Sequence, residues 1–312
     1  MATTTQTQIL FHNQKPSRPS STTTTTPSLP PYEAGSYEFG ALSPTSSHSS
    51  SSPPNYDTPS HHLDAYGLST SSSSSSQPSF HCTKAFQIES QGHPLIALPT
   101  PPQPAPIPVY NVDLASGNVT HLAYESIRLL RCSGNSILIR AGDAEDDPVC
   151  KTTYRWGPGR PPRMQLTGAL SHDEEFEVMN KGLATRAQVF RTHLGTFAWR
   201  YAGRGERKAV GANSLLVMDR IFMVALEGGG QEERRIPVAR FVRNEEVRTR
   251  GTKATTAGNG GRLMVDLREW EGTKGEGEEV EVLVVASCLV MLKKEVDRRR
   301  MHQAVVTVSL VA

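Results

Sequence analysis

The sequence predicts one strand-rich domain of the sandwich or barrel class, preceded by a long disordered tail. From residue 107 onward, short apolar runs alternate with Gly, Asn and Pro turn signals, a pattern typical of all-β domains. One longer apolar segment, residues 280–292, interrupts this series and predicts a buried helix. The residues before position 100 are instead rich in Ser, Thr and Pro, with too few apolar side chains to offset the entropy lost on folding.

We expect residues 1–105 to form a disordered tail and residues 106–312 to form a single folded domain. The tail contains unbroken Thr or Ser runs at residues 22–26, 49–52 and 71–76. A proline cluster at residues 99–108 predicts a stiff polyproline spacer between the two parts.

Two short motifs in the tail predict a partner protein. Residues 29–32 read Leu-Pro-Pro-Tyr and residues 53–56 read Pro-Pro-Asn-Tyr, and both resemble ligands of WW domains, including those of HECT-type ubiquitin ligases. Paired prolines preform a polyproline II turn that lies on an aromatic groove, while the tyrosine fills a second pocket. Two such motifs on one flexible tether would raise avidity, although a Pro-rich tail also produces such strings by chance. The predicted contact residues are Leu29, Pro30, Pro31, Tyr32, Pro53, Pro54 and Tyr56.

Ten apolar runs after the tail predict strands, because each is bounded by residues that favour turns. The expected strands span residues 107–112, 136–140, 152–156, 176–179, 188–193, 196–201, 215–226, 236–242, 263–270 and 305–311. Turn signals lie at residues 116–118, 157–162, 203–205, 228–230 and 258–261. Helical periodicity is lacking between these strands, which favours a sandwich or a barrel.

The segment at residues 280–292 is apolar on nearly every side. It is long for a strand, yet shorter than the roughly 20 residues that a membrane-spanning helix needs. A helix that is apolar all round is a buried helix, so we expect a core helix and no transmembrane segment. Acidic residues precede it and basic residues, including 298–300, follow it, an order that complements the helix dipole. A lipid or nucleic-acid patch at residues 298–300 is the alternative.

Charge and cysteine usage restrict the partners and the compartment. The chain has 33 basic and 31 acidic residues, a net charge of +2, with the two signs interspersed, so we expect no nucleic-acid partner. The 4 cysteines are widely spaced without a CxxC pair, and the N-terminal region lacks a secretory apolar core. We therefore expect free thiols and an intracellular, cytoplasmic location. A peripheral position at membranes and a nuclear one stay open.

The sequence contains no recognisable catalytic motif. A GxSxG elbow, HExxH, a P-loop and GxGxxG are all missing, and the acidic residues 143–147 lack the glycine and terminal glutamate of a calcium loop. We therefore predict no catalytic residue, no metal site and no cofactor. His193, in the strongest predicted strand pair, has no assignable carboxylate partner, and we expect it to satisfy a hydrogen bond or face solvent.

Three stretches of the domain resemble a known superfamily. Residues 153–160 read Thr-Tyr-Arg-Trp-Gly-Pro-Gly-Arg, residues 196–201 read Thr-Phe-Ala-Trp-Arg-Tyr after Phe190, and the last helix ends in three arginines at 298–300. Over roughly residues 120–305 the chain is similar to an uncharacterised group of fungal proteins in the tubby C-terminal-like superfamily, which also holds LURP-one-related proteins and phospholipid scramblases. The resemblance implies a mainly β fold, a closed antiparallel barrel around a central hydrophobic C-terminal helix. Superfamily members usually end at or just after that helix, so the apolar extension at the end of this chain is a departure.

The resemblance also implies a function. Tubby proteins bind phosphoinositides through basic residues on the barrel surface, and the nearest analogue here is the loop at residues 200–208. Its glycines would let the backbone approach a phosphate; the alternative is a solvated hairpin turn. The predicted contacts are Arg200, Arg204, Arg207 and Lys208.

We therefore predict a non-enzymatic binding or adaptor protein. Its barrel would engage a membrane phosphoinositide or a protein partner, and its tail would offer PPxY-type ligands to WW domains. The alternatives are a scramblase-like lipid-handling protein and an enzyme with a dispersed site at a barrel end.

Overall fold

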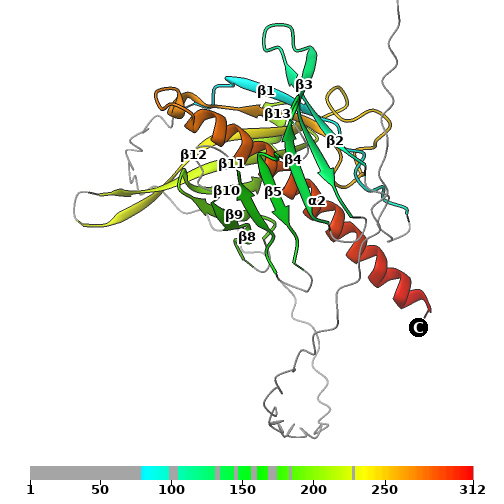
Figure 1. Cartoon of the computed structure of the whole chain (residues 1–312). Helices are drawn as coiled ribbons and strands as arrows, with labels where there is room; N and C mark the ends of the chain where they lie inside the picture. The colour runs from blue at the N-terminus through cyan, green and yellow to red at the C-terminus, as the bar shows by residue number, and fades with distance from the viewer. Residues whose placement is uncertain are drawn as a thin grey trace, which may run out of the picture. The chain divides into compact units, whose positions relative to one another are not determined.

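The computed structural model (Figure 1) describes residues 79–97, 105–130, 134–143, 147–155, 160–167, 174–182, 185–226 and 229–311. All of these belong to the second of the two compact units into which the chain divides, Ser71–Ala312. The predicted WW-ligand motifs at residues 29–32 and 53–56 lie outside the described residues, as does Trp156.

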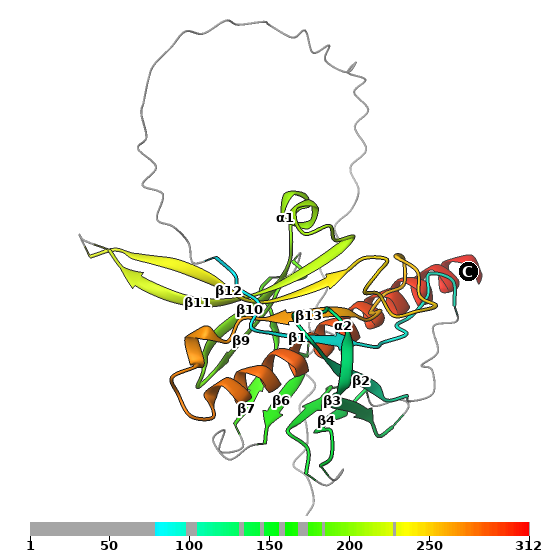
Figure 2. The same cartoon turned by 90° about the horizontal axis from the view of Figure 1, so that it is seen from above.

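Within these residues, a 13-stranded antiparallel sheet dominates the fold. The strands are β1 Lys84–Ile88, β2 Ile107–Val112, β3 Val119–Arg128, β4 Ser136–Arg140, β5 Cys150–Thr153, β6 Arg163–Leu166, β7 Glu175–Glu177, β8 Met179–Asn180, β9 Gln188–Thr192, β10 Gly195–Tyr201, β11 Ser214–Ala225, β12 Gln231–Arg243 and β13 Gly261–Val265. Their spatial order is β7-β6-β5-β4-β3-β2-β1-β13-β12-β11-β10-β9-β8. The sheet curls until β7 approaches β9, which makes a nearly closed barrel (Figure 2). The predicted mainly β fold is confirmed.

Strand β1 shows that the predicted domain boundary is wrong. It lies between β2 and β13 in the sheet, with Phe86 directly opposite Leu263 of β13. The side chains of Phe86 and Ile88 are fully buried. The folded domain therefore includes residues 79–97, which the sequence assigned to a tail ending at residue 105. Such a short apolar run in a Pro- and Ser-rich context carries little local signal, because its stability comes from partners far away in the sequence.

Most other expected strands are present with shifted ends. β2 and β4 have the predicted bounds, and β5 begins and ends earlier than expected. The run expected at residues 263–270 ends as a strand at Val265 and is followed by a short 3-10 turn, η1, at Arg268–Trp270. β3 and β6 were not expected, because exposed or polar residues interrupt their apolar pattern.

The helix α2, Glu276–Val311, contains the expected core helix. Between residues 280 and 292 every side chain except Leu289 is buried, and the buried apolar ones share one hydrophobic core with strand side chains. No helix within the described residues combines the length and apolarity needed to cross a membrane.

Beyond its core segment, α2 continues without interruption. The strand expected at residues 305–311 is therefore wrong, because these residues are helical. Their valines favour a strand intrinsically, but extending a helix that already exists costs little. Residues 298–300 consequently lie inside the helix, and its last turn carries no basic residue. The predicted match between this arginine cluster and the helix dipole is wrong.

Trp199 of β10 links α2 to the sheet. Its ring is fully buried, and its Nε1 donates a hydrogen bond of 2.9 Å to Ser287 Oγ on the helix. This one bond satisfies two buried polar groups inside an otherwise apolar core. The ring of Trp270 is also buried, with its centroid 6.4 Å from that of Phe197. Both tryptophans therefore pack in the hydrophobic core.

The two ends of the sheet meet between β7 and β9. Phe176 of β7 stacks on Phe190 of β9, with ring centroids 5.6 Å apart. Lys294 of α2 contacts the same region, where its Nζ donates to the carbonyl of Val178 and to the side chain of Gln188. Burial lowers the pKa of Lys294 to about 8. Within the described residues, aromatic stacking and a lysine of α2 thus join β7 to β9, between which no strand pairing is formed.

His193, just after β9, adds an ionic contact where β7 and β9 approach each other. Its Nδ1 lies 2.6 Å from Glu174 Oε2, and its Nε2 lies 2.9 Å from Glu279 Oε2 of α2. The sequence could not assign these partners, but the expected hydrogen bonding of His193 is confirmed. Burial lowers the pKa of His193, but its hydrogen bonds to the two carboxylates outweigh burial and raise the pKa above its usual value.

We predict that His193 makes the stability of the fold depend on pH. Because its pKa is raised in the folded state, the stabilisation is complete below the unfolded-state pKa of about 6.5 and is lost as pH rises through the folded-state value. The side chain is 40% exposed, so we expect an effect below about 1 kcal/mol. Denaturant unfolding of the wild type and of His193→Gln across neutral pH measures it. The two proteins should converge at high pH; a constant difference at every pH would contradict the prediction.

Candidate anion-binding cleft

A cleft of about 490 Å³ lies beside α2, past its buried segment. Its walls come from the end of β10, the short helix α1 at Arg204–Ala209, the start of β11, the end of β12 and the loop before β13. Glu295 is the one carboxylate among its described lining residues. The arginines that line it are Arg186, Arg207, Arg243, Arg248, Arg298 and Arg299. We call this site the arginine cleft.

Sheet register and helix periodicity bring these side chains together. Pairing of β11 with β12 places Ser214 opposite Arg243, whose Nη2 donates a hydrogen bond of 2.9 Å to Ser214 Oγ. On α2, Arg298, Arg299 and His302 are spaced so that they lie on neighbouring parts of one face. The paired strands β11 and β12 and the helix α2 thus position much of the cleft, in addition to the loops.

Gly258 allows the loop before β13, which forms one wall of the cleft, to lie close to α2. The N–H of Gly258 donates a hydrogen bond of 2.9 Å to Glu295 Oε2. Gly258 has φ +68°, and a Cβ at this position would lie 2.6 Å from the carbonyl oxygen of Leu292. Only glycine fits both the backbone conformation and the distance.

Arg243 and Glu295 form a buried ion pair at the base of the cleft. Two hydrogen bonds of 2.7 Å join the guanidinium to the carboxylate, and the side chains are 7% and 10% exposed. The hydroxyl of Tyr201 donates a further hydrogen bond of 2.7 Å to Glu295. Burial raises the pKa of Glu295, but the hydrogen bonds from Arg243 outweigh it, so the pKa lies below its usual value. The carboxylate is therefore charged and fully engaged.

Several arginine donors in the cleft have no partner. Arg207 Nε, Arg243 Nε and Arg299 Nη1 are buried and form no hydrogen bond. Within the described residues, no ion pair involves any lining arginine other than Arg243. A buried donor without an acceptor costs about 1–3 kcal/mol.

The chemistry of the cleft favours a phosphate-bearing ligand. Guanidinium groups match the oxygens of phosphate with paired hydrogen bonds, and they stay charged at all physiological pH values. The volume lies within the range of small-molecule sites. Among the described residues no group of His, Cys, Asp and Glu is arranged to hold a metal ion.

The structure separates the four residues predicted as anion contacts. The expected loop contains the helix α1, in which Arg204 and Lys208 are exposed. Arg200 already pairs with Glu206 and Asp219, each at 2.8 Å. Of the four predicted residues, Arg207 is the one that lines the arginine cleft.

Sequence reasoning missed most of the cleft. Residues 298–300 form a visible cluster in the sequence, but the helix dipole offers a simpler explanation for it. The other arginines of the cleft occur singly in distant segments. The register of β12 and the fold of the loop before β13 bring Arg243 and Arg248 into place. No spacing rule in the sequence reports such an arrangement.

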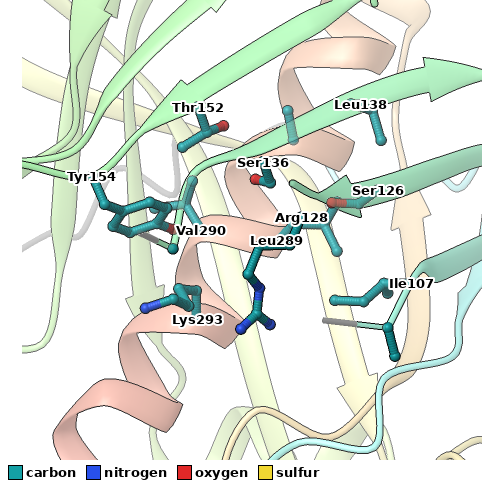
Figure 3. Close-up of a pocket in the computed structure, with 13 residues that line it drawn as sticks. Ile107, Ser126, Arg128, Ser136, Leu138, Thr152, Tyr154, Leu289, Val290 and Lys293 are labelled. Atoms are coloured by element: carbon teal, nitrogen blue, oxygen red, sulfur yellow. The ribbon is translucent and has the colours of Figure 1, made fainter. Parts of the chain in front are cut away.

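A smaller cavity lies between β2–β5 and α2 (Figure 3). Its volume is about 40 Å³, room for about one water molecule. The Lys293 ammonium lies 4.8 Å from the centre of the Tyr154 ring and pairs with Asp297. Because Lys293 is already paired and the volume is small, this cavity is a weaker candidate.

A third cavity, of about 310 Å³, contains a second buried carboxylate. Glu281 accepts a hydrogen bond of 2.8 Å from the hydroxyl of Tyr124 and pairs with Lys84 at 2.6 Å. Arg140, also in the lining, pairs with Glu278. The charges here neutralise one another, in contrast to the arginine cleft.

We predict that Glu295→Gln lowers the free energy of unfolding by about 3 kcal/mol, because it leaves the charge of Arg243 buried without a counter-ion. Urea unfolding of both proteins measures the change. The matched control is Glu206→Gln, which removes the partly exposed partner of Arg200 and should cost less than about 1 kcal/mol. Equal losses in the two variants would contradict the structural role assigned to Glu295.

Comparison of the chain with models of known families, with curated proteins and with solved structures finds no match. The resemblance to the tubby C-terminal-like superfamily therefore stays a prediction. The geometry of the arginine cleft is the observation from which a function can be argued.

Proposed function

We propose that the protein is a non-enzymatic binding or adaptor protein whose folded domain holds a phosphate-bearing anion in the arginine cleft. The observation that carries the proposal is the excess of positive charge there. Six arginines line the cleft, and the one described carboxylate is bound to Arg243. The other five arginines form no ion pair within the described residues, which leaves their charge for an acceptor from outside the chain.

A phosphoinositide headgroup is the ligand that the superfamily resemblance implies, and its phosphate groups suit such a site. The same resemblance implies a barrel closed around the core helix. Burial of nearly every side chain between residues 280 and 292 supports that arrangement. The contacts proposed for this chain are those of the cleft, with Arg207 shared between the cleft and the loop predicted from the sequence.

The adaptor part of the proposal rests on the tail. The motifs at residues 29–32 and 53–56 offer two ligands to WW-domain proteins such as HECT-type ubiquitin ligases. A chain with a ligand-binding domain and such a tail would bring a WW-domain protein to the place where the anion is found.

We predict that the double substitution Arg298→Gln, Arg299→Gln weakens binding of inositol hexakisphosphate, a soluble phosphate-rich probe, at least about tenfold. The reason is that charge-assisted hydrogen bonds contribute about 1.5–3 kcal/mol each, and 1.4 kcal/mol corresponds to a tenfold change in Kd. Isothermal titration calorimetry of the full chain measures the affinity.

The matched control for this experiment is Arg204→Gln, Lys208→Gln. It removes the same charge from α1, outside the cleft lining, and should change the affinity less than about twofold. If the control loses binding and the cleft variant keeps it, the anion binds at the sequence-predicted loop and the cleft assignment is wrong.

We predict that affinity purification of the full chain recovers WW-domain proteins, and that Tyr32→Ala, Tyr56→Ala abolishes the recovery, because each tyrosine fills a pocket of the WW domain. Mass spectrometry of the recovered proteins is the measurement. A variant with Tyr37→Ala and Tyr66→Ala, tyrosines outside the motifs, serves as the control. Identical protein lists from all three chains would show that the motifs are chance strings.

A further inference from the structure

The last turns of α2 expose an unusual amount of apolar surface. After His302 the helix carries no charged residue as far as its end at Val311. Met301, Val305 and Val308 are 67%, 60% and 68% exposed, and Val306 is 58% exposed. Figure 1 shows this part of the helix projecting beyond the strands. Among the described residues nothing covers these side chains, and apolar surface of this kind on a regular helix indicates a contact site.

A loop after β1 adds to this surface. Gln303 of α2 donates a hydrogen bond of 2.8 Å to the carbonyl of Leu95, and its side-chain oxygen lies 2.7 Å from His93 Nε2. These contacts fix the loop against the helix, where Leu95 and Ile96 are 55% and 91% exposed. We call the combined surface the apolar tip: Leu95, Ile96, Met301, Val305, Val306 and Val308.

The apolar tip and the arginine cleft are neighbours on one helix. Arg299 and His302 line the cleft, and Val305 follows within one or two turns, about 5–9 Å along the axis at 1.5 Å per residue. Cationic side chains therefore border an uncharged apolar end. Basic side chains directly beside an apolar segment suit an anionic membrane surface, where cations meet the headgroups and apolar residues enter the layer below them.

We propose that the apolar tip inserts into the surface of a lipid bilayer and that the arginine cleft then receives the phosphate of a lipid headgroup. This inference rests on the proposed function, because it names the source of the phosphate. The bilayer is favoured over a second copy of the chain for two reasons. The tip consists of six side chains, whereas stable dimers bury roughly 1,200–2,000 Å². The cationic clefts of two copies would also be brought close together, whereas an anionic bilayer attracts them.

The test compares binding of the full chain to two kinds of vesicle, phosphatidylcholine alone and phosphatidylcholine mixed with phosphatidic acid. Co-sedimentation should be strong with phosphatidic acid and weak without it. Val305→Asp, Val308→Asp should reduce binding to the mixed vesicles at least about tenfold, because two exposed apolar side chains that the bilayer would bury are replaced by charges that the anionic surface repels. Its affinity for inositol hexakisphosphate should stay unchanged.

The matched control is Leu114→Asp, Met223→Asp, which places the same charges at apolar positions that are 51% and 56% exposed in other elements. It should bind mixed vesicles like the wild type.

Unchanged vesicle binding by the valine variant would overturn the inference. A wild-type chain that forms dimers without vesicles, and loses them in the valine variant, would also overturn it, since the tip would then bind a second copy. A wild-type chain that binds inositol hexakisphosphate but no vesicles would overturn the inference and leave the proposed function standing. Vesicle binding without inositol hexakisphosphate binding would support the tip and count against the phosphate cleft.

Discussion

Burial of an apolar helix on nearly every side is the constraint on which the rest of the structure depends. Between residues 280 and 292, α2 offers no polar face to water, and burying each of its larger side chains contributes on the order of 1.5–3 kcal/mol. A flat sheet covers one side of a helix, so strands that curl bury more of this segment than strands in a plane. The hydrogen bond between Trp199 and Ser287 then links the helix to β10 and satisfies the buried indole N–H.

The ion pair and the hydrogen bonds at the base of the cleft begin where the buried segment of α2 ends. Within three residues after Leu292 come Lys294, which contacts the region between β7 and β9, and Glu295, which pairs with Arg243. Arg243 is nearly buried and needs a counter-ion, because an unpaired charge in that place would cost several kcal/mol. Its counter-ion is Glu295, the one carboxylate among the described lining residues of the cleft. The remaining arginines are therefore left without a negative partner in the described residues, and the excess charge of the cleft is a consequence of stabilising its base.

The sequence was most informative where the signal is local. The bounds of β2 and β4 and the core segment of α2 follow from apolar runs that stand between turn signals or exceed the length of a strand. β1 was missed because its stability comes from β2 and β13, which are distant in sequence. Residues 305–311 were misjudged because valine favours strands, whereas continuity with an existing helix decides the outcome. The cleft could not be predicted, since its arginines come from separate segments that only the register of the sheet brings together.

One continuous helix connects these features. α2 runs from Glu276 through the core and past the cleft to the exposed valines, so backbone hydrogen bonds hold all three parts at fixed spacing and rotation. A ligand in the cleft and a surface at the apolar tip would therefore be oriented relative to the barrel by the helix itself, without a hinge between them. For this reason the apolar end of α2 is better understood as a rigid continuation of the core helix than as an appendage. Its orientation depends on the same buried contacts that stabilise the fold.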